Sequence, residues 1–222
     1  MNSSRDSHPL LVPILLAAGR GSRVGGNKGL LRVLGECLIE RHLRILVDAG
    51  LPTPVVVTGS EGLELESIAA HAGAHVVPNV NWQNGQTSSI RAGIMGLPPQ
   101  TKGFFLMPVD YAAVTAEDWT ELQRAFIAQP LDSRPILRPF YGARGGHPVL
   151  FHQEYAAAFQ SLSNDEPGNV VYRSHLEHVI QVPVRNPHIG LDVDTREDLA
   201  LLTEILMSRS DGPPSTRSER TD

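Results

Sequence analysis

The sequence predicts a single-domain α/β fold, in which helices cover both faces of a doubly wound, mostly parallel sheet. Short apolar runs alternate with helical patterns through the first 130 residues. Strands that are separated by helices usually pair in parallel, with the helices packed on the two faces of the sheet. The 222 residues are enough for one sizeable core, and the hydrophobic fraction of 41% is ordinary for a globular protein.

Each expected element has a local cause. Strands are expected where apolar residues run together, and helices where apolar residues recur every three or four positions. The first helix has a clear end at Gly50, with Pro52 beyond it. The expected strands are 10–17, 54–59, 74–79 and 103–110, and the expected helices are 36–50, 63–73, 88–97 and 116–129. After residue 130 the pattern is less regular, with a helix near 153–162, a turn-rich segment at 163–169, a strand at 178–184 and a final helix at 195–207.

The remaining residues and the overall composition limit the function classes. We expect a flexible N-terminus at 1–9, one domain at 10–207 and a disordered, polar, Pro-rich tail at 208–222. The formal charge of −5 argues against a nucleic-acid or anionic membrane surface as partner. A single cysteine, Cys37, provides neither an internal disulfide nor a cysteine metal site, and it is expected to be buried. We therefore expect a cytoplasmic protein without a membrane or nucleic-acid partner.

A glycine-rich loop, LLAAGRGSRVGGNKGLL at residues 15–31, directly follows the first expected strand. Bare backbone in such a loop can approach phosphate oxygens closely and offer several N–H donors. Gly19, Gly21 and Val24 nearly form the G-x-G-x-x-G pattern of a dinucleotide site, with Glu40 at the distance of a ribose-binding acid. A Walker loop is excluded because no Lys-Ser or Lys-Thr pair follows the glycines.

Carboxylates follow two further strand ends. Asp110 ends the run GFFLMPVD, and Asp192 and Asp194 lie in GLDVDTREDLALL. Carboxylates at the carboxyl ends of parallel strands can hold Mg²⁺ against a triphosphate, although Asp110 could instead cap local structure. The pairs His71/His75 and His175/His178 lack a third ligand nearby, so we interpret them as surface residues.

The glycine-rich loop resembles the signature L-A-A-G-x-x-x-R-M-G-x-x-K-x-L-L of the MobA-like NTP transferases, which include molybdenum cofactor guanylyl- and cytidylyltransferases. Three later segments also resemble motifs of this family, in the expected order: NGQTSSIRAGI, GARGGHPVLF and GLDVDTREDLALL. The resemblance covers about residues 10–207. It implies a Rossmann-like fold of the nucleotide-diphospho-sugar transferase type.

The resemblance also implies roles for individual residues. The catalytic residues would be Lys28, Arg23 and Asp110, and the Mg²⁺ ligands would be Asp110 and Asp194, the latter by alignment to a D-T pair. Arg144 and His147 would border the acceptor. The nucleotide-binding set would be Leu16, Ala17, Ala18, Gly19, Gly21, Ser22, Arg23, Gly25, Lys28, Ser88, Ser89 and Arg91.

The implied reaction is Mg²⁺-dependent transfer of CMP, or another NMP, from an NTP to the phosphate of molybdopterin, with release of pyrophosphate. A client molybdoenzyme would be a further partner. Ala18, where guanylyl-type members have glycine, and the TSSIRAG stretch favour CTP. NDEPGNVV departs from the family's G-D-x-G-A-R, so another phosphate acceptor stays open. A nucleotide-binding maturation factor or an NAD(P)H-dependent reductase that uses the same pocket also remains open.

Overall fold

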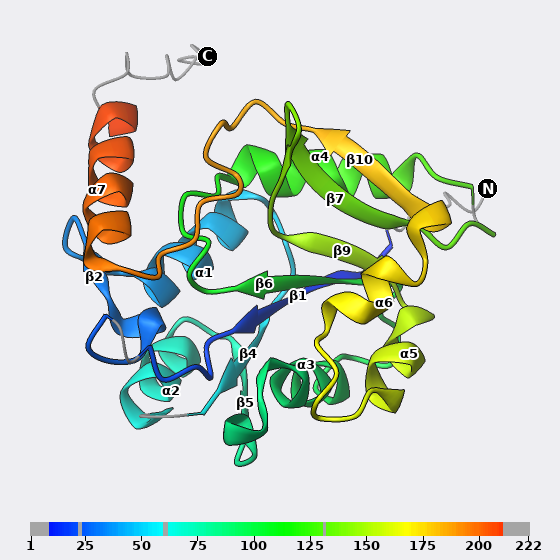
Figure 1. The fold of residues 1–222 in the computed structure, drawn as a ribbon, viewed down its shortest axis with the longest axis horizontal. Coiled ribbons are helices and arrows are strands. Elements are labelled where there is room, and N and C mark those ends of the chain that lie inside the picture. The colour runs from blue at the N-terminus through cyan, green and yellow to red at the C-terminus, as the bar shows by residue number, and fades with distance from the viewer. Residues whose placement is uncertain (1–8, 22–23, 60–61, 131, 211–222) are drawn as a thin grey trace, which may run out of the picture.

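A mixed sheet of eight strands runs through the centre of the molecule (Figure 1). The computed structural model describes residues 9–21, 24–59, 62–130 and 132–210. The predicted N-terminal and C-terminal tails fall mainly on residues 1–8 and 211–222, which lie outside the described residues. The strands of the sheet are β1 (Leu11–Leu16), β4 (Val55–Thr58), β5 (His75–Pro78), β6 (Gly103–Pro108), β7 (Ile136–Tyr141), β8 (Arg144–Gly145), β9 (Val149–His152) and β10 (Val179–Pro183).

The strand order confirms the predicted doubly wound arrangement. It reads β10-β7-β9-β6-β1-β4-β5, with β8 paired to β7. Strand β1 lies between β4 and β6 and pairs in parallel with both, and β4 and β5 are also parallel. Strand β9 is antiparallel to β6 and β7, which accounts for the less regular sequence after residue 130.

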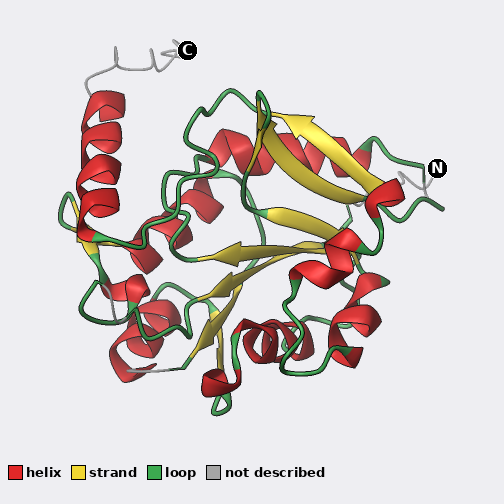
Figure 2. Cartoon of the chain, in the orientation of Figure 1, coloured by secondary structure: helices red, strands yellow, loops and turns green. Residues whose placement is uncertain are grey.

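Helices cover both faces of the sheet (Figure 2), as predicted. They are α1 (Leu38–Asp48), α2 (Gly62–His71), α3 (Gln86–Met95), α4 (Ala116–Ile127), α5 (Tyr155–Ser161), α6 (Asn169–Arg173) and α7 (Arg196–Ser210). Buried side chains of α1, α2 and α4 form one core cluster, and those of α3, α5 and α6 form the other. Within β1, Leu15 belongs to the first cluster and Ile14 and Leu16 to the second, because successive strand residues face opposite sides.

Besides β7, β8 and β9, for which no strand was predicted, local structure differs from the sequence interpretation at three places. The segment before α1 forms a hairpin of β2 (Arg32–Val33) and β3 (Glu36–Cys37), turning through Leu34 and Gly35 at positive φ, so α1 begins at Leu38. The predicted turn-rich segment is followed by the short helix α6, and α7 continues to Ser210. Among the described residues, no helix has the length and apolar character needed to cross a membrane.

Candidate active site

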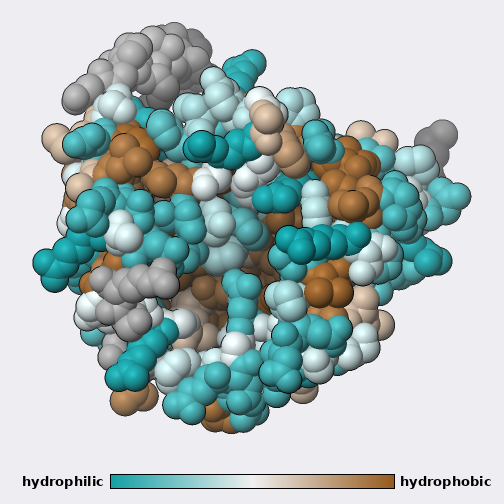
Figure 3. All heavy atoms as spheres, in the orientation of Figure 1, coloured by the Kyte–Doolittle hydropathy of each residue, from teal (hydrophilic) through white to brown (hydrophobic). Residues whose placement is uncertain are grey.

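Two adjoining clefts lie at the carboxyl ends of β1 and β6. The first, of about 340 Å³, is lined by Leu16, Ala18, Gly19, Arg20, Gly21, Lys28, Trp82, Gln83, Gly85, Gln86, Ser89, Pro108, Val109 and Asp110. The second, of about 550 Å³, is lined by residues of β6, β7, β9 and α6, together with Asp192 and Asp194. Leu16, Gln86, Pro108 and Asp110 line both clefts, so Asp110 lies where they meet. Figure 3 shows a hollow near the middle of the viewed face, with hydrophobic residues below a hydrophilic rim.

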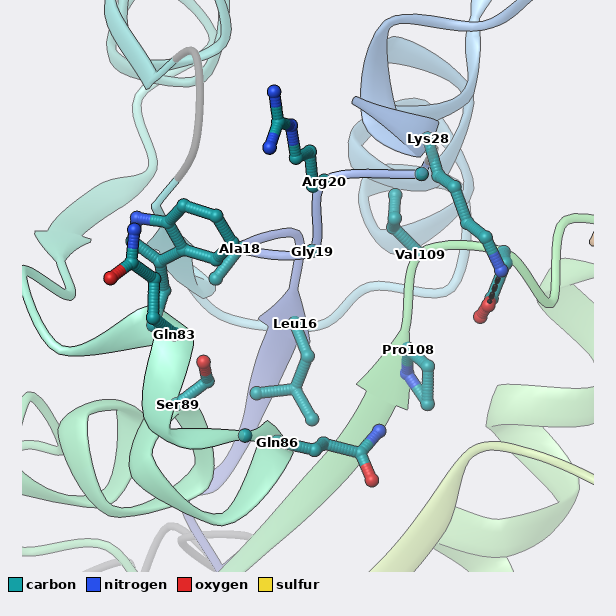
Figure 4. A pocket seen from close by; sticks show the side chains of 14 residues that line it. Leu16, Ala18, Gly19, Arg20, Lys28, Gln83, Gln86, Ser89, Pro108 and Val109 are labelled. Carbon is teal, nitrogen blue, oxygen red and sulfur yellow. Dashed lines mark hydrogen bonds and ion pairs between the residues drawn. The ribbon is translucent and has the colours of Figure 1, made fainter. Parts of the chain in front are cut away.

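The glycine-rich loop forms one wall of the first cleft, with Lys28 on the opposite side from Gln83 and Ser89 (Figure 4). Asn27 holds the loop against β1, because its amide donates to the carbonyl of Ala17 at 3.0 Å and its oxygen accepts from Gly29 N–H at 2.8 Å. Gly21 has a φ of +58°, and a Cβ there would lie 2.1 Å from the carbonyl oxygen of Gly26. The loop therefore requires glycine at position 21 to return toward Lys28.

Lys28 joins the two predicted metal ligands. Its Nζ lies 2.6 Å from Oδ2 of Asp110 and also contacts Oδ1 of Asp194. Burial alone would lower the pKa of Lys28, but the bonds to both carboxylates outweigh it and leave that pKa raised. Burial raises the pKa of Asp110 despite the bond from Lys28. The other carboxylate oxygen of Asp110, Oδ1, is buried and has no hydrogen-bond partner among the described residues.

The loop after β6 is held by side chains from distant elements. The resemblance to MobA-like NTP transferases implies a proline soon after the aspartate that Asp110 matches, whereas Tyr111 and Ala112 follow Asp110 here. In this chain, His42 Nε2–H donates to the carbonyl of Val109 at 2.9 Å, and Arg41 Nε donates to the carbonyl of Ala112 at 2.8 Å. Helix α1 therefore fixes the backbone on both sides of Asp110 and Tyr111.

A second set of bonds connects this loop to the chain around Asp194. Asn186 and Arg209 both donate to the carbonyl of Ala113, at 3.0 and 2.8 Å. The N–H of Val193 donates to the carbonyl of Asp110 at 3.1 Å. The two segments that carry the carboxylates are therefore held in fixed relation to each other.

We expect His42 to make folding less favourable as the pH falls from 7 to 5. Burial lowers the pKa of His42 to about 4 in the folded protein, whereas an unfolded histidine keeps a value near 6.5. The unfolded state therefore binds more protons in this interval, and stability that is complete above pH 6.5 is lost on acidification. The expected loss from this residue is about 2 kcal/mol at pH 5.

Urea unfolding at both pH values would measure this effect in the wild type and in His42→Gln. The free-energy difference between the two proteins should shrink as the pH falls. The same change at the exposed His75 serves as the control. An equal pH dependence in wild type and His42→Gln would contradict the assignment.

Only some of the nucleotide-binding residues predicted from the sequence line the first cleft. Leu16, Ala18, Gly19, Gly21, Lys28 and Ser89 line the first cleft. Ser88 is buried and bonds to backbone carbonyls and to Asn79, and Arg91 donates to the carbonyl of Leu162 at 2.9 Å, so neither lines this cleft. Ala17 packs in the core, and Gly25 does not line the cleft either. Ser22 and Arg23 lie outside the described residues.

The residues of the first cleft that were not predicted from the sequence include Trp82, Gln83 and Gln86. Trp82 and Gln83 lie on a short 3-10 helix at Trp82–Asn84, and Gln86 begins α3. Gly85, with a φ of +92°, joins these two elements. The available signal was the segment WQNGQ directly before TSSIRAG, in which two glutamines flank a turn.

The second cleft contains one of the two predicted acceptor residues. His147 lines it, with its ring 4.4 Å from that of Tyr111 between centroids, and burial lowers the pKa of His147 to about 4. Arg144 is exposed and does not line this cleft. Arg138, Tyr172 and Arg173 line it instead. None of these three residues was predicted from the sequence, because they lie in a strand and a short helix without a recognised motif.

Comparison with known proteins agrees with the fold and the loop signature. The model of the MobA-like NTP transferase domain matches residues 13–179. The nicotine blue oxidoreductase of Paenarthrobacter nicotinovorans is 28% identical over 205 residues, covering 86% of this chain and 95% of the relative.

Solved structures show the same fold. Rv0371c from Mycobacterium tuberculosis superposes with a TM-score of 0.75 at 24% identity, over 89% of this chain and 100% of that one. Its complex with manganese superposes with a TM-score of 0.71 at 23% identity, over 88% and 98% of the two chains. A nucleotidyl transferase from Methanothermobacter thermautotroptrophicus reaches a TM-score of 0.74 at 18% identity, over 90% and 99%. Because the family model matches about three quarters of the 222 residues, the chain belongs to the MobA-like NTP transferase family.

Proposed function

We propose that the protein is a Mg²⁺-dependent nucleotidyltransferase that transfers CMP from CTP to the phosphate of a molybdopterin-type acceptor. The observation that carries this proposal is the contact of Lys28 with Asp110 and Asp194 where the two clefts meet. An oxygen of the acceptor phosphate attacks the α-phosphorus of the NTP. The bond from the α-phosphorus to its bridging oxygen breaks, and pyrophosphate leaves with that oxygen.

The first cleft suits the nucleotide. Backbone N–H groups of the glycine-rich loop can bind the triphosphate, while Lys28 and Arg20 supply positive charge on the same side. Gln83, Gln86 and Ser89 can form hydrogen bonds with the base or ribose. The reaction needs no covalent enzyme intermediate, so positioning and charge stabilisation are the protein's whole contribution.

The residues present fit a magnesium ion. Asp110 and Asp194 would hold it, and the buried Oδ1 of Asp110 still lacks a partner within the described chain. No group of three His, Cys, Asp or Glu side chains in the described residues could bind a metal alone, which suits Mg²⁺ because phosphate oxygens and water usually complete its coordination. When bound, the ion would neutralise charge on the phosphates.

Pyrophosphate release with each NTP, with and without molybdopterin, tests the proposal. We expect release that depends on both molybdopterin and Mg²⁺. No release with any NTP in the presence of molybdopterin and Mg²⁺ would refute this reaction. Release with a different phosphorylated acceptor, and not with molybdopterin, would refute the acceptor and keep the class.

We expect CTP to be preferred over GTP and ATP by roughly 10- to 200-fold in kcat/KM, equivalent to about 1 to 3 kcal/mol. Ala18 belongs to a tightly packed wall, because a Cβ on Gly59 would lie 2.9 Å from the methyl of Ala18 and 2.8 Å from Cβ of Trp82. The methyl of Ala18 would stiffen this turn and take up room beside the base, but a few contacts give only modest discrimination. Competition at equal NTP concentrations would measure it, and a preference for GTP or ATP would refute the pyrimidine assignment alone.

A reductase is the second candidate, because the relative that matches over 95% of its length is named an oxidoreductase. A nicotinamide dinucleotide could span the two clefts, with its pyrophosphate on the glycine-rich loop. Quenching of NADPH fluorescence by the protein, followed by NADPH consumption with a reducible heterocycle, would favour this function. A nucleotide-binding maturation factor would instead bind NTP without turnover.

A further inference from the structure

The second cleft contains a positively charged side chain without a counter-ion among the described residues. Arg138 lies on β7 and is half-buried. Its Nε donates to the carbonyl of Gly146 at 3.3 Å. The described part of the chain places no carboxylate at ion-pair distance from its guanidinium, and the terminal nitrogens have no partner there. Four N–H donors therefore remain available to a ligand.

The guanidinium occupies a preformed cradle. Its central carbon lies 5.4 Å from the ring centroid of Tyr172 and 5.6 Å from that of Phe140, distances typical of cation–π contacts. Gly145 pairs with Phe140 across the β7–β8 ladder, and a Cβ at position 145 would lie 2.8 Å from both Cζ and Nε of Arg138. Because residue 145 is glycine, the guanidinium of Arg138 can occupy the space that a side chain at this position would fill.

The surroundings indicate what this cation would bind. Arg173 lines the same cleft, and His147 is neutral at physiological pH because burial lowers its pKa. The carboxylates of Asp110, Asp192 and Asp194 also line the cleft, so an anion would be favoured next to Arg138 and Arg173 rather than beside these acids. The rings of Tyr111 and Tyr172 provide flat surfaces for a planar heterocycle.

We propose that Arg138, cradled by Gly145, Phe140 and Tyr172, binds an anionic group of a planar heterocyclic acceptor and determines which acceptors the second cleft admits. The planar fork of arginine matches a carboxylate or phosphate through two parallel hydrogen bonds. This inference rests on the proposed function and specifies its acceptor side. It gives Arg138 the role in acceptor recognition that the family motif suggests for Arg144, which is exposed and outside the cleft.

Fluorescent pterins provide a binding test that needs no turnover. Anisotropy titrations of the full chain would compare pterin-6-carboxylate with the neutral 6-hydroxymethylpterin. We expect wild type to bind the carboxylate at least 10-fold more tightly, and Arg138→Met to bind both probes equally weakly. Arg138→Lys should fall between them because it keeps the charge and loses the fork.

Two further variants distinguish a loss of carboxylate recognition by Arg138 from a general loss of structure. Gly145→Ala keeps the arginine but fills its cradle, so it should also lose the preference for the carboxylate probe. Arg124→Met removes an exposed arginine of α4 that is 69% accessible, and it should behave as wild type. Melting temperatures within a few degrees of wild type would establish that each variant is folded.

The outcomes distinguish this inference from the proposed function. If Arg138→Met keeps the preference for the carboxylate, or if wild type binds neither probe, the inference is wrong. If wild type releases pyrophosphate with molybdopterin, and Arg138→Met leaves the KM for molybdopterin unchanged, the inference fails and the proposed function stands. If pterin binding depends on Arg138 but no NTP releases pyrophosphate, the proposed function fails and the inference stands.

Discussion

Replacement of Lys28 by alanine is expected to lower kcat for pyrophosphate release by roughly 30- to 1000-fold, equivalent to about 2 to 4 kcal/mol of activation free energy. The ammonium group of Lys28 lies at the junction of the two clefts, where the proposed reaction would develop charge on the leaving pyrophosphate. Its removal takes away a positive charge that is already in place before the reaction. We expect a smaller effect on folding, because Asp194 is 45% exposed and water can screen the carboxylates that lose their partner.

Steady-state release of pyrophosphate from CTP would measure this loss, with circular dichroism to establish folding. The chain offers a matched control in its other lysine, Lys102, which is exposed before β6 and lines neither cleft. Lys102→Ala should retain the wild-type rate. A folded Lys28→Ala protein with that same rate would refute the catalytic role.

The central strands and the glycine-rich loop could be predicted from the sequence because each has a local cause. Strands β1, β4 and β6 are runs of apolar residues that are buried on both faces. The glycines and Lys28 follow one of these strand ends directly, and Asp110 follows another. Since parallel strands end at the same edge of a sheet, the first glycines after β1 and Asp110 after β6 were expected to lie near each other.

Other features depend on contacts between distant segments. His42 and Arg41 lie on the first helix and hold a loop that is 67 and 71 residues away in the sequence, so no local pattern indicates their roles. Ser88 and Arg91 match a motif, yet they turn toward Asn79 and Leu162, because helix geometry decides which side chains face the cleft.

Arg138 illustrates a second reason why sequence alone was insufficient. It lies in β7, in a segment for which the sequence predicted no strand, and β9 inserts antiparallel between β6 and β7. Arg138 of β7 then lies 5.4 Å from the ring of Tyr172 of α6, and Tyr172 and Arg173 belong to a segment for which the sequence predicted no element. Non-local strand pairing of this kind leaves no periodic signal in the sequence.

Asp110 and Asp194, the two carboxylates that contact Lys28, are expected to be more sensitive to substitution than the neighbouring Asp192. We expect Asp110→Asn and Asp194→Asn each to raise the Mg²⁺ concentration for half-maximal activity and to lower kcat, because an amide oxygen is a weaker ligand than a carboxylate for a hard cation. Asp192→Asn should be milder. Asp192 lines the second cleft, but Lys28 reaches Asp110 and Asp194 and has no bond to Asp192.

The Mg²⁺ titration discriminates these carboxylates because the three variants remove the same charge within one small region. A general electrostatic effect would therefore change Mg²⁺ activation to a similar degree in all three variants. Loss of a metal ligand would change it strongly only in Asp110→Asn and Asp194→Asn. Measuring Mn²⁺ binding to the folded proteins by electron paramagnetic resonance adds a readout independent of turnover. If Asp192→Asn weakened both activation and Mn²⁺ binding more than Asp194→Asn, Asp192 would replace Asp194 as the second metal ligand. The carboxylate of Asp194 would then serve only to position Lys28.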